Sequence, residues 1–583
     1  MDKIEIIVVG PWDNGRSKRC MVERGSSLKD LAEKVGGKLP LKYEPVGALV
    51  NNSLEPLDYK LYNPKSVKFV DVTHKLGMRM YQQSLCFMLY KAVKEILPQG
   101  RLQIEHSMSN GFFCKITVPM SEEPEACGEA DAHPQPDGES QPGACQTETA
   151  RMIRERMLEL EKKNLPFSTR LIPTEDAIKL FEEVGDETAL NVLKGSSHIY
   201  SHIQFLDGIP IHLNGAMVPS TGYLKCWDFR TFEDGYLLQW PDSENPEKLS
   251  FYQETPKLFH IFQEHLKWVD LLQVPTIEAL NRVVKEKGSN HLIQVSEALH
   301  EKKYAEIAEM INQRRGEVKM VLLAGPSSSG KTTSCRRLDV QLSVLGFDVQ
   351  QMSLDDYFVS RDRTPKQPNG DYDFEALEAL DIPLLNEHLN RLFKGERVEI
   401  PTYDFKKGES FYSGKSLQMG KDSILIVEGI HALNPKLTED IPEELKFRVY
   451  VSALTQIAID DQNLIHTSDN RLIRRIVRDN NFRGWDALET MKRWDSVQRG
   501  EQLHIFPFQE NADVMFNSAL LYELGVLRLY AEPQLKCVPQ NCEEYAEAKR
   551  LLNFLEHVNM IDPRSIPPTS IMREFLGGSS FEY

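Results

Sequence analysis

The stretch "VLLAGPSSSGKTTSC", residues 321–335, decides the fold of the second half of this 583-residue chain. Residues 325–332 fit the complete P-loop pattern Gly-x-x-x-x-Gly-Lys-Thr. The apolar run before them predicts a buried strand, and the residues after them predict a helix. The glycines let backbone N–H groups turn inward around phosphates, and the helix N-terminus adds positive potential. The sequence therefore predicts a nucleotide site at this loop.

The mechanism of a P-loop assigns roles to its residues. Lys331 would reach the β- and γ-phosphates, and Thr332 would bind Mg²⁺. The apolar strand "SILIVE" ends at Glu428, which is predicted to support the Mg²⁺, partly through water. The predicted ATP- and phosphate-binding residues of the loop are Gly325, Ser327, Ser328, Ser329, Gly330, Lys331, Thr332 and Thr333.

Two acidic residues follow the next predicted strand, in "QMSLDDYF" at 351–358. A kinase that phosphorylates a hydroxyl group needs a carboxylate that orients the acceptor and can take its proton. Asp355 is the candidate, and Asp356, its neighbour on an extended segment, is expected to point away. The alternative is a pair of acids that cap a helix or line a solvated turn.

An arginine-rich segment, "NRLIRRIVRDNNFRG" at 470–484, lies further along. An exposed charged helix is the plain interpretation. Behind a P-loop, a lid that closes over the phosphates and offsets their charge is favoured. Its arginines are Arg471, Arg474, Arg475, Arg478 and Arg483.

The domain organisation follows from the pattern of predicted elements. From 318 to 530, strands and helices alternate, which predicts an α/β domain with a parallel sheet and helices on both faces. The other predicted segments are a small domain at 1–70, an α+β domain at 71–250, a helical connector at 251–317 and a C-terminal helical extension at 531–583. The acidic, Pro/Gly-rich stretch 121–148 is predicted to be a disordered insertion, because it offers little apolar surface to bury.

Composition excludes several classes of protein. A net charge of −17 argues against wholesale binding to nucleic acid or to an anionic membrane. The nine cysteines form no Cys-x-x-Cys pair, so neither a zinc ribbon nor a disulfide framework is indicated. We find no signal-peptide pattern and no apolar run of about 18 residues, and we expect a cytoplasmic protein without a membrane partner.

The motifs of residues 318–530 together resemble the uridine kinase/phosphoribulokinase family. They are "GPSSSGKTT", "SLDDYF", "YDFEALEALD", "PTYDF", "ILIVEGIHAL" and "RLIRRIVRD", in that order. The resemblance implies an ATP- and Mg²⁺-dependent kinase, commonly a homo-oligomer. Carried over by position, the catalytic residues are Asp355, Lys331 and Arg475, the acceptor contacts are Asp355, Asp373, Tyr403 and Arg475, and Arg478 joins the ATP site.

The positions that contact the pyrimidine base depart from that family. Gly408 stands where uridine kinases have a histidine, and Trp485 and Arg493 replace a lid arginine and a glutamine. A nucleoside kinase is the first hypothesis. A sugar or polyol kinase on the same fold remains open, as does an RNA-associated regulatory protein that binds ATP without turnover.

The front half resembles two modules of threonyl-tRNA synthetases. Residues 1–70 look like the ubiquitin-like TGS domain, and residues 71–240 look like the second additional domain, which edits mischarged tRNA. That resemblance implies an RNA or nucleotide ligand. The zinc-ligand positions of the editing domain fall on Gln83, Phe87, Leu213 and Met217, and His74, His106, His202 and His212 lie at other spacings. Because leucine and phenylalanine cannot bind zinc, we expect neither zinc nor editing activity.

Overall fold

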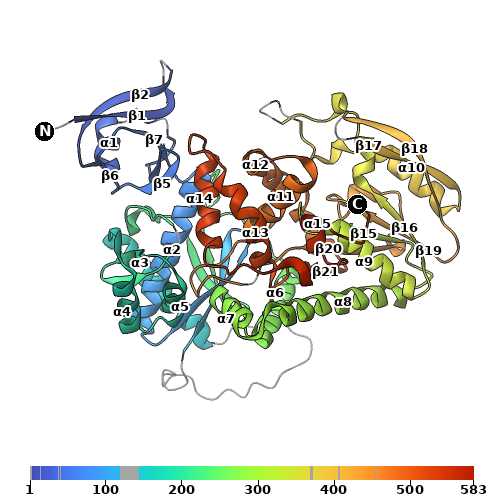
Figure 1. Ribbon diagram of the computed structural model, residues 1–583, viewed down its shortest axis with the longest axis horizontal. Coiled ribbons are helices and arrows are strands. Elements are labelled where there is room, and N and C mark those ends of the chain that lie inside the picture. The colour runs from blue at the N-terminus through green and yellow to red at the C-terminus, as the bar shows by residue number, and fades with distance from the viewer. Residues whose placement is uncertain are drawn as a thin grey trace.

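The computed structural model describes residues 3–582, except 13–14, 37–38, 40, 119–143, 214, 368–369, 371, 405–406 and 456 (Figure 1). Most of the insertion predicted at 121–148 lies outside the described residues. Its last part, 144–148, was wrongly assigned to disorder, because helix α3 (Ala144–Lys163) begins there. This helix packs against α2 (Lys75–Ile96), and residues 145–148 lie in its first turns at mostly exposed positions.

The first 70 residues form a sheet with one helix across it. The strand order is β2-β1-β7-β4-β5, with β1 and β7 parallel and the other pairs antiparallel. Helix α1 (Leu28–Val35) starts at a capping box, in which Ser27 and Asp30 each accept a hydrogen bond from the backbone N–H of the other. The strands are β1 (Lys3–Trp12), β2 (Gly15–Glu23), β4 (Gly47–Val50), β5 (Ser53–Pro56) and β7 (Lys65–Val70), and a small pair joins β3 (Ser26–Ser27) to β6 (Lys60–Leu61).

The next segment, 71–250, contains two antiparallel sheets and the long, mostly buried helix α2. The four-stranded sheet has the order β13-β14-β9-β8 and consists of β8 (Arg101–Met108), β9 (Gly111–Thr117), β13 (Asp228–Phe232) and β14 (Gly235–Gln239). The three-stranded sheet consists of β10 (Phe167–Pro173), β11 (Tyr200–Leu206) and β12 (Ile209–Ile211). Two short helices, α4 (Thr174–Val184) and α5 (Glu187–Gly195), complete the segment.

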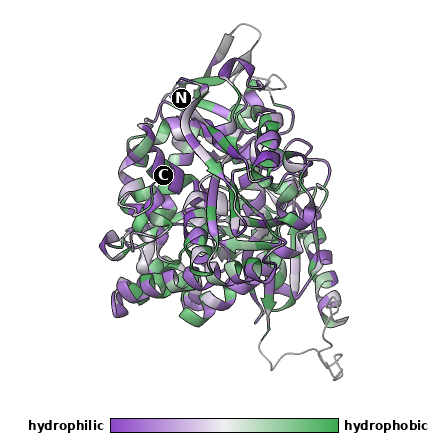
Figure 2. Ribbon diagram, turned by 90° about the vertical axis from the view of Figure 1, so that its right-hand side faces the viewer, coloured by the Kyte–Doolittle hydropathy of each residue, from purple (hydrophilic) through white to green (hydrophobic). Residues whose placement is uncertain are grey.

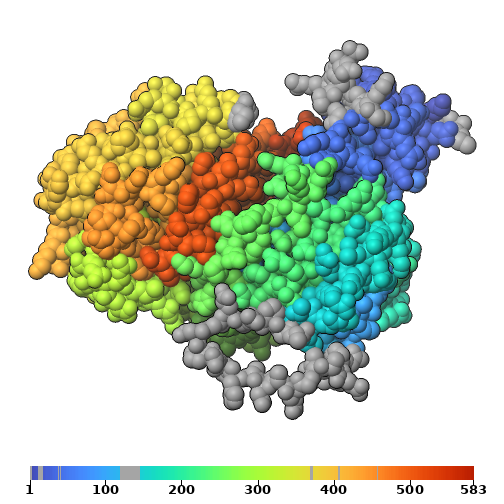
Figure 3. All heavy atoms as spheres, turned by 180° about the vertical axis from the view of Figure 1, so that it is seen from behind, coloured from blue at the N-terminus to red at the C-terminus, as the bar shows by residue number. Residues whose placement is uncertain are grey.

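The helical connector packs against the kinase-like part. It contains α6 (Pro256–Leu272), α7 (Ile277–Lys287) and α8 (Ser289–Gln313). Buried Arg337 on the P-loop helix forms ion pairs with Glu297 and Glu301 of α8, at 3.4 and 2.6 Å. Viewed from behind, the connector and the C-terminal segments fill the space between the two halves of the molecule (Figure 3).

The kinase-like part contains the predicted parallel sheet, with strand order β16-β19-β15-β20-β21. Its strands are β15 (Met320–Ala324), β16 (Asp348–Ser353), β19 (Ser423–Glu428), β20 (Lys446–Ser452) and β21 (Val514–Asn517). The helices are α9 (Lys331–Val344), α10 (Ile382–Phe393), α11 (Thr467–Arg483) and α12 (Ala487–His504), and β17 (Arg397–Asp404) pairs with β18 (Glu409–Gln418) as a separate hairpin. Because all five strands run parallel, their carboxyl ends meet at one edge, where ligands bind in such sheets.

The C-terminal segment returns to the front of the chain. The boundary predicted at residue 530 falls inside α13 (Glu523–Lys536), so that helix is shared by both predicted segments. Helix α14 (Glu544–Leu555) packs against β5 (Figure 1), and Lys68 forms an ion pair with Glu543 at 2.7 Å. A short final helix, α15 (Met572–Leu576), lies against α11.

Polar and apolar residues are interspersed along the ribbons of Figure 2. Within the part of the chain that the structure describes, no helix combines the length and the apolar character that crossing a membrane requires.

Candidate active site

The P-loop connects β15 to α9 through two residues in the left-handed region, Ser328 with φ 60° and Gly330 with φ 84°. Gly325 must be glycine for steric reasons, because a Cβ there would lie 2.0 Å from the carbonyl oxygen of Val451 on the neighbouring strand. This backbone turns successive N–H groups towards the inside of the loop. The loop therefore has the shape of a phosphate cradle.

The predicted metal ligands converge beside the loop. The Thr332 hydroxyl donates to Oε1 of Glu428 at 3.4 Å, and Ser353 at the end of β16 donates to the same oxygen at 3.3 Å. Burial raises the pKa of the Glu428 carboxyl to about 7, and nearby Asp355 adds to the rise while Lys331 opposes it. Hydroxyl and carboxylate oxygens are the ligands that Mg²⁺ prefers, so these residues fit a magnesium ion.

Asp355 and Asp356 point to different surroundings from the short 3₁₀ helix Leu354–Tyr357. The Asp355 side chain is exposed at the mouth of the site. The protein around its carboxylate displaces water and so raises its pKa, and the positive charge of Lys331 opposes that rise. Asp356 instead accepts a hydrogen bond from the backbone N–H of Tyr403 and lies 3.8 Å from the Lys415 ammonium. Asp355 is therefore placed near the phosphate loop, while Asp356 holds this 3₁₀ helix to the β17–β18 hairpin.

The arginines of α11 divide into two groups. Arg471 and Arg474 are buried and form ion pairs with Glu501 and Glu523. They also donate to the P-loop carbonyls of Ser327 and Ser328, at 3.1 and 3.4 Å, and their predicted part in a lid stays a prediction. Arg475 donates to the Ser327 hydroxyl at 2.8 Å.

The remaining two arginines of α11 lie further along the helix. Arg478 and Arg483 pair with Asp479, at 2.8 and 3.6 Å, and their positive charges, like that of Lys331, oppose the rise in the pKa of Asp355. The arginines of α11 that contact the P-loop are therefore Arg471, Arg474 and Arg475.

One acidic residue that the sequence analysis missed lies at the site. Burial raises the pKa of Glu375 to about 7, Glu501 adds to the rise, and Arg475 and Lys331 oppose it. Asp373, the predicted acceptor contact, uses its carboxylate to accept a hydrogen bond from the Glu375 backbone at 3.2 Å. Glu375 is therefore a second candidate for the acceptor-side carboxylate, and the contact predicted for Asp373 stays a prediction.

Tyr403, the other predicted acceptor contact, lies in the core of the hairpin. Its ring is buried and packs against Phe358 with 5.5 Å between the ring centres. Its backbone holds Asp356, as described above. A direct contact between Tyr403 and an acceptor stays a prediction.

Three of the four positions matched to zinc ligands belong to the apolar core of the front half. Phe87, Leu213 and Met217 are buried there, and Gln83 lines a cavity. Among the residues that the structure describes, no group of three or more His, Cys, Asp or Glu side chains is arranged to hold a metal ion. The absence of zinc remains an expectation.

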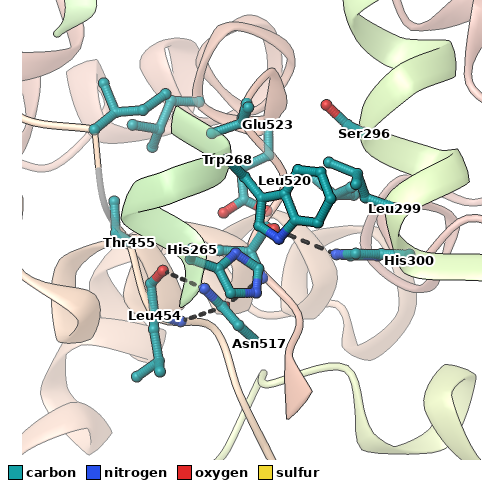
Figure 4. Close-up of a pocket in the computed structure, with 14 residues that line it drawn as sticks. His265, Trp268, Ser296, Leu299, His300, Leu454, Thr455, Asn517, Leu520 and Glu523 are labelled. Atoms are coloured by element: carbon teal, nitrogen blue, oxygen red, sulfur yellow. Dashed lines mark hydrogen bonds between the residues drawn. The ribbon is translucent and has the colours of Figure 1, made fainter. Parts of the chain in front are cut away.

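A separate hollow lies between the connector and the kinase-like part (Figure 4). His265 and Trp268 come from α6 and His300 from α8, and the segment after β21 forms the opposite wall. The Asn517 side chain exchanges two hydrogen bonds of 2.9 Å with the backbone of Leu454. They join the segments after β20 and β21, and the His300 ring lies 3.3 Å from the Ala519 carbonyl, between connector and sheet. We assign these groups no chemistry.

Comparison with known proteins agrees with this geometry. Residues 320–520 match the model of the "Phosphoribulokinase / Uridine kinase family". A uridine kinase of Deinococcus deserti is 30% identical over 196 residues, which are 33% of this chain and 84% of that protein. The chain belongs to the phosphoribulokinase/uridine kinase family. Membership confirms the predicted P-loop kinase fold and, at the level of the family, an ATP-dependent phosphotransferase with a hydroxyl acceptor.

The coverage of the other relatives differs. A uridine kinase of Schizosaccharomyces pombe is 33% identical over 181 residues, but these are 31% of this chain and only 36% of that protein. A threonine–tRNA ligase of Clostridium kluyveri is 24% identical over 234 residues, 40% of this chain and 32% of that enzyme. The predicted likeness to threonyl-tRNA synthetases is thus confirmed for part of the chain, and the TGS and editing-like domains stay predictions.

Proposed function

We propose that this protein is an ATP-dependent kinase that phosphorylates a hydroxyl group of a nucleoside-like small molecule. The observation that supports it most is the position of Asp355. Its carboxylate stands near Lys331 of the P-loop, at the edge where the parallel strands end. A protein that only binds ATP would need no acceptor carboxylate there, which disfavours the RNA-associated regulatory alternative.

Each residue of the site has a separate role in the proposed phosphoryl transfer. Lys331 and the loop N–H groups hold the phosphates, and Arg475 lies beside them through Ser327. Thr332 and Glu428 would hold Mg²⁺, which when bound neutralises charge on the transferred group. Asp355 would orient the acceptor hydroxyl and take its proton, and Glu375 would contact a second acceptor hydroxyl.

The surroundings of Gly408 support an acceptor other than uridine. A Cβ at Gly408 would lie 2.6 Å from Nε of Arg361, so a histidine side chain has no room there in this arrangement. Arg361 also donates its backbone N–H to the Gly408 carbonyl at 2.9 Å. A guanidinium group therefore occupies the neighbourhood in which uridine kinases have their base-contacting histidine.

The acceptor is tested by measuring ADP release with a panel of nucleosides, sugars and polyols, with and without added RNA. We expect turnover with at least one purine or pyrimidine nucleoside. Turnover with sugars or polyols alone would replace the nucleoside proposal by the second kinase hypothesis. ATP binding without turnover on any acceptor would contradict the kinase proposal.

The front half has a direct structural connection to the site. The loop before α11 is bound to 71–250 by Asp461, whose carboxylate accepts two hydrogen bonds from Arg101 at 2.6 and 2.8 Å. Its backbone carbonyl accepts from Ile104 at 2.8 Å, and the Asn463 amide donates to the carbonyl of His212 at 2.8 Å. We infer that the front half positions the base of α11, whose middle contacts the P-loop.

Through the same contacts, a ligand bound to the front half could affect the kinase site. A small pocket, open to solvent, lies between α2, the loop before α11 and α14, and Asp469 of α11 forms part of its wall. An RNA or nucleotide ligand, which the synthetase resemblance suggests, would act on the kinase by moving α11. That role remains part of the proposal.

The connection is tested by Arg101→Ala, which removes an exposed side chain of the front half. We expect kcat/KM to fall about fivefold or more, because couplings between sites are typically 1–3 kcal/mol. The matched control is Arg154→Ala, which breaks the ion pair between Arg154 and Asp228 inside the front half. Equal activity of both variants and the wild type would show that α11 does not depend on this contact.

A further inference from the structure

The C-terminal segment 570–577 covers one side of the P-loop. Ile571 is fully buried, and its Cγ2 lies 2.7 Å from where a Cβ on Gly330 would be. Asn481 of α11 donates to the carbonyl of Phe575 at 3.0 Å, and the Phe575 ring packs under the Arg474 guanidinium. The last helix is thus held against both the P-loop and α11.

Glu574 of this segment binds the N-terminal end of the P-loop helix. Its Oε2 accepts hydrogen bonds from the backbone N–H of Thr333 at 3.2 Å and from the Thr333 hydroxyl at 2.6 Å. The first N–H groups of a helix have no partner within the helix, and in a P-loop they are donors for the nucleotide phosphates. A carboxylate of this protein therefore occupies a donor that the nucleotide would use.

A second carboxylate on the loop differs in how firmly it is fixed. Glu501 accepts from the backbone N–H of Ser327 at 3.1 Å, but both its oxygens also bind buried Arg471. Glu574 is only half-buried, and no lysine or arginine in the described part of the chain forms an ion pair with it. Its negative charge also adds to the raised pKa of Glu428 at the metal position. Of the two carboxylates, Glu574 is thus the one that can move away from the P-loop.

We propose that Glu574 competes with the nucleotide phosphates for Thr333, so that ATP binds only when this carboxylate moves away. Two like charges cannot share one donor in a partly buried site without a large cost. The C-terminal segment then sets the affinity for ATP, and its position depends on whether a nucleotide is bound. The inference rests on the ATP site of the proposed function.

The test is Glu574→Gln in the full-length chain, which keeps the size of the side chain and removes the charge. We expect the Kd for ATP, measured by calorimetry, to fall about fivefold or more. Glu582→Gln is the matched control, because it removes the same charge from an exposed residue a few positions beyond this segment. Glu574→Ala is the second variant, in case glutamine alters folding, and it should tighten binding in the same direction.

Hydrogen exchange of residues 566–582 provides an independent measurement. In the wild type, we expect ATP to increase exchange in this segment, because Glu574 must release Thr333. ATP affinity that is unchanged or weaker in both Glu574 variants, with normal binding by the wild type, would overturn the inference. Absence of ATP binding by the wild type and all variants would instead overturn the proposed function together with it.

Discussion

Replacing Lys331 by alanine should reduce phosphoryl transfer about 10³-fold or more. The lysine is the first residue of α9, and its ammonium donates to the carbonyl of Pro326 at 3.2 Å, across the mouth of the loop. From there it can reach the β- and γ-phosphates, where no other lysine of this loop can replace its charge. The measurement is single-turnover transfer from labelled ATP with the acceptor found in the panel.

The fold should survive this change. Lys331 is only half-buried and belongs to no apolar cluster, so the melting temperature of the variant should stay close to that of the wild type. Lys394→Ala, at the exposed end of α10, is the control for loss of one positive charge. Near-normal transfer by Lys331→Ala would remove the P-loop from the mechanism.

Replacing Asp355 by asparagine should lower turnover about 10²–10⁴-fold and leave ATP binding nearly unchanged. Asparagine keeps the size of the side chain but has neither the charge nor the basicity to take the proton of the acceptor. Asp356→Asn should cost much less, because its carboxylate holds the hairpin through Tyr403 and Lys415. The reverse order of effects would show that the acceptor meets Asp356.

The pH dependence gives a second check of the same role. The pKa of Asp355 is raised, so its carboxylate takes up a proton at a higher pH than an ordinary aspartate. Since a general base must be deprotonated, wild-type kcat/KM should fall as the pH drops through that raised pKa. The residual kcat/KM of Asp355→Asn should not show this fall at low pH. If its pH profile had the same fall as that of the wild type, Asp355 would be excluded as the base.

Local patterns were sufficient to predict the elements that carry the nucleotide site. The P-loop, the strand before it and the helix after it lie within one short stretch, and the ends of parallel strands must meet at one edge of the sheet. Thr332 and Glu428 therefore came together as predicted, although they are 96 residues apart. The family match bears out the fold and the class of reaction, while the individual site residues remain to be tested.

What the sequence could not reveal are the partners of each charged residue. Arg471, Arg474 and Arg475 have helical spacing, but only the packing shows that two of them face buried glutamates. The choice between Asp373 and Glu375 depends on which way an irregular segment turns, and that segment has no periodicity to read. The contact between Glu574 and Thr333 joins residues 241 positions apart, and no local pattern predicts it.

The return of α14 to the front of the chain affects how the protein is made. Arg79 on α2 binds Glu547 on α14, and the two residues are 468 positions apart. At about 5–20 residues per second, a ribosome needs roughly half a minute to a minute and a half to synthesise the chain between them. During that interval the front of the nascent polypeptide waits with this surface uncovered. Newly made chains should therefore depend on chaperones until α14 has been synthesised.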